Sequence, residues 1–556
     1  MLLVLSAIVP IAAVVVLMLV FNRPAKVAMP IGWGLAVLAA VFVWRQDIRT
    51  ACAWATDGFL EAIGTLAIIA GAVAIMNILK ATGAMSTIER LFTSLTPDRR
   101  IQAVIVGFVF EAFLEGAAGF GTPAAIAAPL LVGLGFAPVC AAVIALILNS
   151  SPVNFGAVGV PVSTAVAVTS QSVEAAGVPT AQYCLAVTFW SAAVNAVLSF
   201  FVVFAALFVM CRFFGERKRG ADALPALPFV LFTCTVYGFF SVLTAFFFGP
   251  EFPSLVGGIV TLAIAVFAAK RGFLLPRETW RFPGERFDGT KGAESGNLAR
   301  MSPLLAWAPY GLVALLLVLT RLNAFGLKGF LTSAACTVSI GSVFGIARVT
   351  WKWNWGWCPG ILPFLLVCLV TLVFQRCPKD RFKTAVRTTW NQCAGAGLAL
   401  FFGVSMVYIY RNTGMNAHVE SSMLFVLAKA LADVFSCAYV AVAPLIGVLG
   451  AFMSGSNTVS NTLFAGLQYQ TAVLVKLSPV LIVVLQNIGA AAGNMICVNN
   501  VVAACATTGT SGKEGQIIRT NMPVCFVYCF IAVAIVGTAL YFGVDPLQLL
   551  AKELAK

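Results

Sequence analysis

The sequence predicts an all-α polytopic membrane protein with about 12 to 13 transmembrane helices in two repeats, each with a re-entrant hairpin and a broken helix. Three observations lead to this fold class. The 556 residues are 60% hydrophobic and only 10% charged, whereas soluble chains average about 25% charged residues. Uncharged runs of membrane-spanning length recur along the chain. Similar motifs also return in the same order in both halves.

The apolar runs mark the candidate membrane crossings, each of which needs about 20 mostly apolar residues. Uncharged runs of about this length occupy residues 1–22, 27–44, 62–79, 223–250, 252–269, 301–320, 353–375 and 522–544. Two other uncharged runs, 116–173 and 434–475, are too long for one straight crossing and are rich in Gly, Pro, Ser, Thr and Asn. The first run lacks a basic start and a clear cleavage site before Arg23, so we expect a retained first helix rather than a signal peptide.

The net charge of +14 gathers in connecting loops. Basic clusters lie at residues 212–219, 270–300 and 376–387, each directly after an apolar run. Basic loops tend to lie on the cytoplasmic side of a membrane, so we expect a cytoplasmic loop at 271–300. Because the clusters are short and follow membrane helices, lipid rather than nucleic acid is the expected partner.

The reactive side chains indicate neither a metal site nor an enzyme. Most of the 15 cysteines lie in apolar runs, where Cys behaves as a small hydrophobe, and no spacing suggests disulfides or zinc ligands. His418 is the single histidine. The GAAGFG string at 116–121 lacks the strand–helix context of a dinucleotide site, Gly512-Lys513 lacks the glycine pattern of a phosphate loop, and no GxSxG occurs. We expect no metal, no cofactor and no catalytic residue.

Three blocks suggest that the chain contains a duplicated unit. Residues 57–85 resemble residues 388–415, which pairs Lys80 with Arg411, each followed by a Thr-Gly dipeptide. The segment that begins at Phe108 resembles the one that begins at Gly447, and the segment that begins at Ile147 resembles the one that begins at Leu485. Chance similarity between apolar segments is the alternative interpretation.

The duplication predicts a division of the chain. We expect N-terminal transmembrane helices at 1–47, a first transport repeat at 48–173, connecting transmembrane helices at 174–379, a second transport repeat at 380–512, and a C-terminal transmembrane helix with its tail at 513–556. Transporters often bind substrate between discontinuous helices of inverted repeats. Our count of crossings between the repeat starts is even, which favours parallel repeats, but one misplaced segment reverses that parity.

The segment Glu111–Pro129 is predicted to form the first hairpin. Glu111 and Glu115 are four residues apart and share a helix face. Gly116, Gly119 and Gly121 then interrupt the helix, and Thr122 begins a new one before a proline. The free N–H groups at such a helix start can hold a carboxylate. A glycine-rich crossing that only permits close helix packing is the alternative.

The second hairpin is predicted around two Ser-Asn-Thr triplets. Their hydroxyl and amide groups lie in an uncharged run, where burial without hydrogen bonds would cost a few kcal/mol each. They must pair with backbone, water or a ligand, or they serve only as a helix cap. The residues concerned are Ser456, Asn457, Thr458, Ser460, Asn461 and Thr462.

Two polar interruptions are predicted to be the unwound midpoints of broken helices. One follows Leu148, and the other lies at Gln486–Gly489 with polar residues continuing to Asn500. Their amides and carbonyls could complete a polar site with the hairpin tips, although an ordinary polar kink is an equal alternative. The candidate binding residues there are Asn149, Ser150, Ser151, Asn154, Asn487 and Asn494.

The long strings in these segments closely resemble the lactate permease family, within the wider ion-transporter group. They are FLEGAAGFGTPAAIAAPLL (113–131), LILNSSPVNFGAVGVPV (146–162), GSNTVSNTLFAGLQ (455–468) and LQNIGAAAGNMICVNNVVAACATTG (485–509). The resemblance covers nearly the whole chain. It implies a proton symporter for L-lactate and related 2-hydroxy acids such as glycolate and D-lactate, in the bacterial cytoplasmic (inner) membrane. It also implies inverted repeats, which we prefer to the parity count.

The resemblance and the residues together give a working hypothesis. The substrate carboxylate lies between the helix starts at Thr122 and at Asn457 and Asn461. Glu115, with Glu111 as its neighbour, accepts the proton, because burial disfavours the ionised form of a carboxyl group. Some relatives carry an acidic residue in place of Asn457, and some carry a histidine or another polar residue in the stretch held here by Asn499, so neither position is expected to titrate here.

The roles of the cations and the coupling ion have alternatives. Lys80 and Arg411 either balance the glutamates or extend to the interface. A sodium-coupled carboxylate transporter and a channel are the rival functions. The sequence decides neither the oligomeric state nor the preferred stereoisomer.

Overall fold

The computed structural model describes residues 2–547 except 20, 22, 24, 93–95, 118, 120–121, 284–300, 322–325, 359–360, 415–418, 420, 511–512 and 545. The described chain is almost entirely helical. Six of its helices are long and apolar enough to cross a membrane, and shorter apolar helices accompany them. The predicted all-α polytopic membrane fold is therefore confirmed, while the total of about 12 to 13 crossings stays a prediction from the apolar runs.

The elements follow one another in a simple order. The helices of the first half are α1 (Leu2–Leu19), α2 (Ala25–Phe42), α3 (Ile48–Thr82), α4 (Ala84–Phe92), α5 (Arg99–Gln102), α6 (Glu111–Ala117), α7 (Thr122–Gly133), α8 (Pro138–Asn149), α9 (Gly156–Ala175), α10 (Thr180–Phe214), α11 (Leu227–Phe248) and α12 (Pro253–Lys270). Those of the second half are α13 (Pro303–Arg321), α14 (Leu327–Leu331), α15 (Leu362–Phe374), α16 (Lys379–Asn412), α17 (Met423–Phe435), α18 (Tyr439–Ser454), α19 (Asn457–Leu474), α20 (Pro479–Asn494), α21 (Val498–Thr508) and α22 (Glu514–Tyr541).

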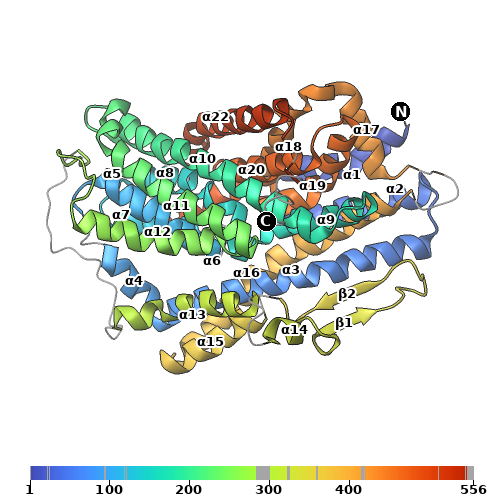
Figure 1. Cartoon of the computed structure of the whole chain (residues 1–556), viewed down its shortest axis with the longest axis horizontal. Coiled ribbons are helices and arrows are strands. Elements are labelled where there is room, and N and C mark those ends of the chain that lie inside the picture. The colour runs from blue at the N-terminus through green and yellow to red at the C-terminus, as the bar shows by residue number, and fades with distance from the viewer. Residues whose placement is uncertain are drawn as a thin grey trace.

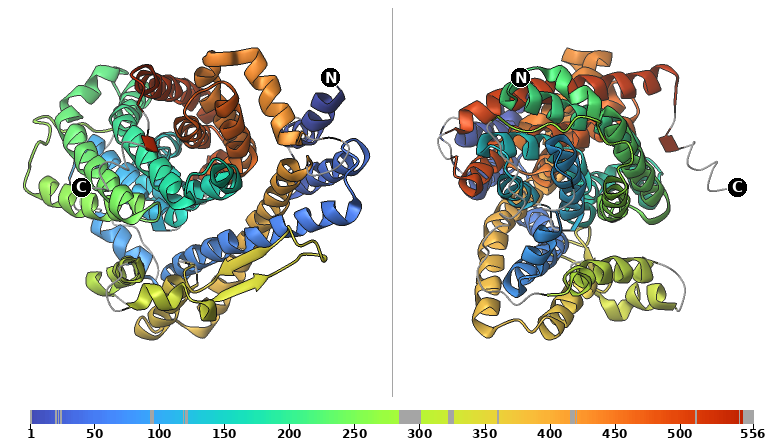
Figure 2. Two further views of the ribbon diagram at one scale, coloured as in Figure 1. Left: turned by 45° about the vertical axis from the view of Figure 1, so that its right-hand side comes forward. Right: turned by 90° about the vertical axis from the view of Figure 1, so that its left-hand side faces the viewer.

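Two long helices, α3 and α16, form one side of the molecule. They have 35 and 34 residues, which at 1.5 Å per residue is about 50 Å and exceeds the roughly 30 Å hydrocarbon thickness. Figures 1 and 2 show them beside α13, α15 and the two strands, whereas α6–α12 and α18–α22 gather on the other side. Helices α9 and α19 of that second group pack against α3 and α16 respectively.

A small β-hairpin replaces part of one predicted crossing. Strands β1 (Thr337–Ile340) and β2 (Trp351–Asn354) pair antiparallel, with Thr337 opposite Asn354. The helix within the uncharged run 353–375 is therefore shorter than the run, because only Leu362–Phe374 is helical. Trp351 and Trp353 alternate with Lys352 and Asn354, which is the two-residue period of a strand rather than a helix.

One of the two predicted helix breaks lies where we expected it. Helix α8 ends at Asn149, and a 3-10 turn over Pro152–Phe155 leads into α9. The second prediction is wrong, because α20 continues without interruption through Gln486–Gly489 and ends only at Asn494. The break before α21 follows at residues 495–497.

Close packing explains why the glycine in α20 does not end that helix. A Cβ on Gly489 would lie 2.0 Å from the carbonyl oxygen of Pro444 in α18, and a Cβ on Gly447 would lie 2.4 Å from that of Gln486. These glycines therefore let α18 and α20 touch backbone to backbone, as small residues do between membrane helices.

Candidate functional site

The first hairpin has the predicted order of helix, break and new helix. Helix α6 ends at Ala117 and α7 begins at Thr122. Gly119 adopts a left-handed φ of +56°, and a Cβ there would lie 2.7 Å from the backbone nitrogen of Ala157. Only glycine fits such a turn pressed onto another backbone. Gly121 lies outside the described residues, and of Thr122 the structure describes only the backbone.

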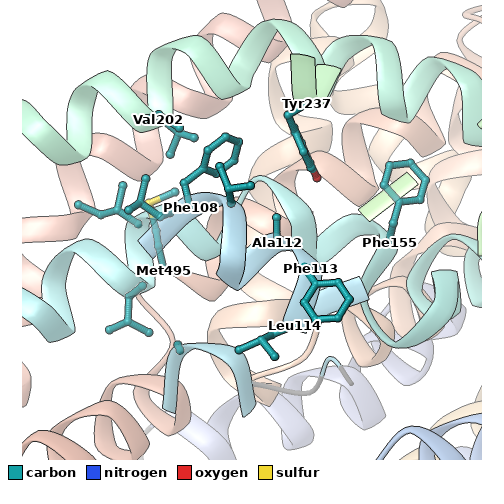
Figure 3. Packing of buried hydrophobic residues seen from close by; sticks show 14 of the residues in the cluster. Phe108, Ala112, Phe113, Leu114, Phe155, Val202, Tyr237 and Met495 are labelled. Atoms are coloured by element: carbon teal, nitrogen blue, oxygen red, sulfur yellow. The ribbon is translucent and has the colours of Figure 1, made fainter. Parts of the chain in front are cut away.

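Both glutamates lie in the apolar interior. Glu115 is 1% exposed and its Oε2 accepts a hydrogen bond of 2.8 Å from Asn149 Nδ2. Glu111 is fully buried, and neither of its carboxyl oxygens has a hydrogen-bond partner within the described chain. The neighbouring side chains Phe108, Ala112, Phe113 and Leu114 project into a hydrophobic cluster that also contains Phe155 and Tyr237 (Figure 3). Such surroundings favour the neutral form of a carboxyl group.

The helix that carries these glutamates has an unusual start. Residues Ala103–Phe110 form a π-helix directly before Glu111. Segments of π-helix are rare and frequent at functional sites. The residues there are entirely apolar apart from their backbone, so their pattern gave no sign of this geometry.

The break between α8 and α9 is strongly irregular. Ala157, Val158 and Gly159 have φ of 43°, 59° and 76°. A left-handed conformation is a genuine outlier for a β-branched residue such as Val158 and costs about 1–3 kcal/mol. The surrounding contacts hold it, because a Cβ on Gly159 would meet the carbonyl of Pro250 at 2.2 Å. Strain of this kind gathers at functional sites.

The polar residues of this break lie inside the protein. Ser150 donates to the carbonyl of Ile147. The carbonyl of Ser151 accepts from Asn195 Nδ2 in α10, while its own hydroxyl is buried without a partner in the described part of the chain. Asn195 was not predicted and is fixed in turn by the hydroxyl of Tyr528 at 2.8 Å.

The second hairpin turns at Gly455, which has a left-handed φ of 74°. Ser456 then caps α19 by accepting a hydrogen bond from the amide of Val459. The Thr462 hydroxyl donates to the carbonyl of Thr458 within the same helix, and the Ser460 hydroxyl donates to that of Gly447. These hydroxyls are therefore used by the fold, as the helix-cap alternative supposed.

The two asparagines of the hairpin instead reach across to other helices. Asn457 Nδ2 donates to Asn154 Oδ1 at 2.9 Å and to the carbonyl of Asn487 at 3.4 Å. Asn461 Nδ2 donates to Asn487 Oδ1 at 2.8 Å and to the carbonyl of Pro161 at 3.0 Å. The two predicted repeats thus meet in a chain of buried amides.

Gln468, which we did not predict, extends this network together with Gln486, which lies in the second predicted break but was not among the candidate binding residues. Gln468 Nε2 donates to Gln486 Oε1, and Gln486 Nε2 donates to Ser460 Oγ. All three side chains are buried. A glutamine or asparagine inside an apolar span is itself a signal of a partner, and it would have identified Gln468 and Asn195.

Open hydrogen-bonding positions remain where the two predicted repeats meet. Asn154 Nδ2 and Asn457 Oδ1 are buried and have no partner in the described part of the protein. The first is a donor and the second is an acceptor. The contact of Asn457 Nδ2 with the Asn487 carbonyl supports this orientation of the amides. Buried polar groups without partners are uncommon and call for an explanation.

A small cavity opens beside these atoms. Its volume is about 10 Å³, which holds about one water molecule. It combines Glu115 of α6 with the tip of the second hairpin, the break before α9 and the last residue of α20. The lining residues are Glu115, Val153, Gly156, Ala157, Pro161, Gly455, Ser456, Asn457, Thr458 and Asn494.

The predicted cations do not lie with the two glutamates. Lys80 is exposed in the last turn of α3, which fits the interfacial alternative. Arg411 stacks on Tyr408 at 4.4 Å and donates to the carbonyl of Val168 in α9 at 3.4 Å. The acidic groups that interact with it electrostatically are Asp57 and Glu61 of α3. If Arg411 balances acidic residues, they are therefore Asp57 and Glu61.

Comparison with known proteins gives a consistent result. The model of the family described as L-lactate permease matches residues 3–543. The L-lactate permease of Bacillus subtilis is 31% identical over 87% of this chain and 86% of its own, and the glycolate permease of Escherichia coli K12 is 28% identical over 93% and 91%. Among solved structures, the Alcanivorax borkumensis YdaH transporter shares 14% identity over 88% of both chains at a TM-score of 0.45.

Proposed function

The chain belongs to the L-lactate permease family, whose members are transporters and not enzymes, and from this premise we propose that it carries L-lactate together with protons. Glycolate and D-lactate, as related 2-hydroxy monocarboxylates, are further proposed substrates. The proposed location is the bacterial cytoplasmic membrane, in agreement with the basic loops. The proposed substrate agrees with the names of the relatives.

The observation that carries this proposal is the pair of open amide atoms on Asn154 and Asn457, which bond to each other, because Asn457 lines the cavity together with Glu115. A 2-hydroxy acid presents a carboxylate, which needs donors, and a hydroxyl group, which needs an acceptor. Asn154 Nδ2 offers the donor and Asn457 Oδ1 offers the acceptor. The backbone amides at the start of α7 are the proposed second anchor for the carboxylate.

The size of the cavity requires movement in this mechanism. Lactate is several times larger than the single water that fits there. We therefore propose that the hairpin tips at Gly119 and Gly455 separate from the break at Asn154–Gly159 to admit substrate. The bond between Asn457 and Asn154 would open in that step and close again around the empty site.

Glu115 is the proposed carrier of the proton. It lines the cavity, whereas Glu111 lies one helical turn away in the apolar cluster. A protonated Glu115 can enter the membrane interior as a neutral group, and its proton neutralises the substrate's charge. Asn149 would hold the carboxyl in place in both protonation states, because its amide can donate or accept.

Uptake of labelled L-lactate into proteoliposomes tests the proposal directly. An inward proton gradient without sodium should drive accumulation, and a protonophore should abolish it. If uptake depends on sodium and does not change with the proton gradient, the coupling ion is sodium and not the proton. Non-saturating conductance without accumulation would mean a channel, and uptake of glycolate but not lactate would change only the preferred substrate.

Replacing Asn457 by alanine is expected to weaken the apparent affinity for lactate by roughly 10- to 100-fold. The change removes the proposed acceptor for the substrate hydroxyl and the partner of Asn154, and a buried polar group left without its partner costs about 1–3 kcal/mol. The measurement is the lactate dependence of initial uptake. Asn77→Ala is the matched control, because this buried asparagine bonds to Thr389 between α3 and α16, away from the cavity. Equal affinity in Asn457→Ala and the wild type would contradict the assignment.

A further inference from the structure

A groove of about 820 Å³ lies between the second half of α10 and the first half of α22. It is separate from the cavity at Glu115 and shares no lining residue with it. Its α10 wall includes Phe201, Phe208 and Phe213, and its α22 wall begins at Lys513. Phe208 is 45% and Phe213 is 57% exposed, so the groove opens toward the surroundings of the protein and not toward its core.

The groove changes from polar to apolar along the axis of α22. Lys513, Gln516 and Arg519 line its first part, and Pro523, Val524 and Val527 line its second part. Spacings of three and four residues place these side chains on one side of the helix. Lys513 and Arg519 are exposed and form no ion pair within 4.0 Å in the described chain, and Glu514 does not line the groove.

The length of the α10 wall, which is apolar throughout, matches one leaflet of a bilayer. Phe201 and Phe213 both line the groove and are twelve residues apart on α10, which corresponds to about 18 Å. The hydrocarbon of one leaflet is about 15 Å deep, half of the roughly 30 Å core. An acyl chain can therefore lie along the groove from the membrane surface to near the midplane.

The polar end of the groove lies at the basic, cytoplasmic end of the molecule. Phe213 lies at the end of α10 within the basic cluster 212–219, and Arg212 stacks over its ring at 5.9 Å. Arg100 donates to the carbonyls of Asp222 and Glu278, which joins this loop region to the second basic loop. Basic loops mark the cytoplasmic side, where anionic lipids attract Lys and Arg.

From these four features we propose that the groove binds an anionic glycerophospholipid. One acyl chain lies between the apolar walls of α10 and α22, and the phosphate is held by Lys513 and Arg519, with Gln516 as a further donor. The apolar walls exclude a free phosphate as the preferred occupant, and the two unpaired cations favour an anionic over a zwitterionic headgroup. The lipid joins two helices that pack on each other and is expected to stabilise that contact.

The test is lipid binding by the purified full-length protein after delipidation. Native mass spectrometry would measure retention of phosphatidylglycerol, phosphatidylcholine with the same chains, and inorganic phosphate. We expect the wild type to retain phosphatidylglycerol over phosphatidylcholine. Lys513→Ala/Arg519→Ala should weaken phosphatidylglycerol binding by about fivefold per cation, or roughly 30-fold for the pair. Ala205→Trp, which fills the groove from α10, should lower retention of both lipids.

The control variant removes the same amount of positive charge at a place outside the groove. Lys270→Ala/Arg271→Ala removes one Lys and one Arg at the end of α12, beside the second basic loop and outside the groove, and should leave retention unchanged. The proposal is overturned if the groove variants retain phosphatidylglycerol as the wild type does, or if the control loses it equally. It is also overturned if inorganic phosphate binds as tightly as the lipid, since the site would then be an anion site without a lipid.

Discussion

Glu115→Gln is expected to abolish proton-driven accumulation of lactate while exchange of lactate across the membrane persists. Glutamine keeps the size of the side chain and can still accept from Asn149, but it cannot carry a proton. With a gradient of one pH unit, one coupled proton supports about tenfold accumulation, because about 1.4 kcal/mol corresponds to a factor of ten. In the variant, the internal concentration should rise no higher than the external one.

Two measurements on proteoliposomes separate coupling from binding. Accumulation under a pH gradient reports proton coupling, and counterflow of labelled against unlabelled lactate reports substrate passage without a net proton flux. Glu174→Gln is the matched control, because Glu174 is an exposed acid at the far end of α9. If Glu115→Gln accumulates lactate like the wild type, the proton is carried elsewhere, and Glu111→Gln becomes the variant to measure.

Gly489→Ala is expected to destabilise the protein by at least about 3 kcal/mol, at the upper end of overpacking effects. The added methyl group would lie 2.0 Å from the carbonyl oxygen and 2.6 Å from two other backbone atoms of Pro444. No side chain can rotate out of the way, so α18 and α20 must separate. Because the unfolding entropy grows with chain length, at about 2.1 cal/mol/K per residue, the melting temperature of this 556-residue chain should fall by roughly 3 °C. Transport should be lost because α20 carries Asn487 and Asn494.

Thermal melting in detergent and size-exclusion chromatography would measure this effect. Gly537→Ala is the control, because a Cβ there meets nothing within 4 Å. That change should be neutral or slightly stabilising, since alanine is the better helix former by about 0.5–1 kcal/mol. If Gly489→Ala has the same melting temperature as the control variant, α18 and α20 do not approach each other this closely in solution.

Much of the hairpin architecture could be predicted because its causes are local. Glycine clusters end helices, and Ser456 begins one by capping it, so the order of elements around Gly119 and Gly455 follows from neighbouring residues. The same local reasoning misplaced the break in α20. Gly489 is needed there because it contacts Pro444 of α18, which lies 45 residues earlier in the chain, and not because of the residues next to it. The pairing of Thr337–Ile340 with Trp351–Asn354 was not predicted, because it joins two segments whose sequences do not by themselves identify their partner.

The candidate site could also be predicted from the sequence only in part. Glu111, Glu115 and the Ser-Asn-Thr triplets could be named from the sequence, since polar groups in an uncharged membrane span need partners or a function. Which of these residues face one another could not be predicted from the sequence. Arg411 and Lys80 have equivalent places in the predicted repeat, yet Arg411 meets α9 and Lys80 is exposed. The duplication, the division of the chain and the assignment of site residues stay predictions.

The sequence by itself determined that this protein is a helical membrane protein of the lactate permease family, because length, apolarity and motif order are properties of the chain. Only the tertiary structure decided that Asn457 lies against Asn154, that Glu115 borders the cavity while Glu111 does not, and that this cavity holds little more than a water molecule. The physical reason is that these contacts join residues up to about 300 positions apart. Helix periodicity fixes which side chains share a face, but the packing of one helix on another fixes what that face meets.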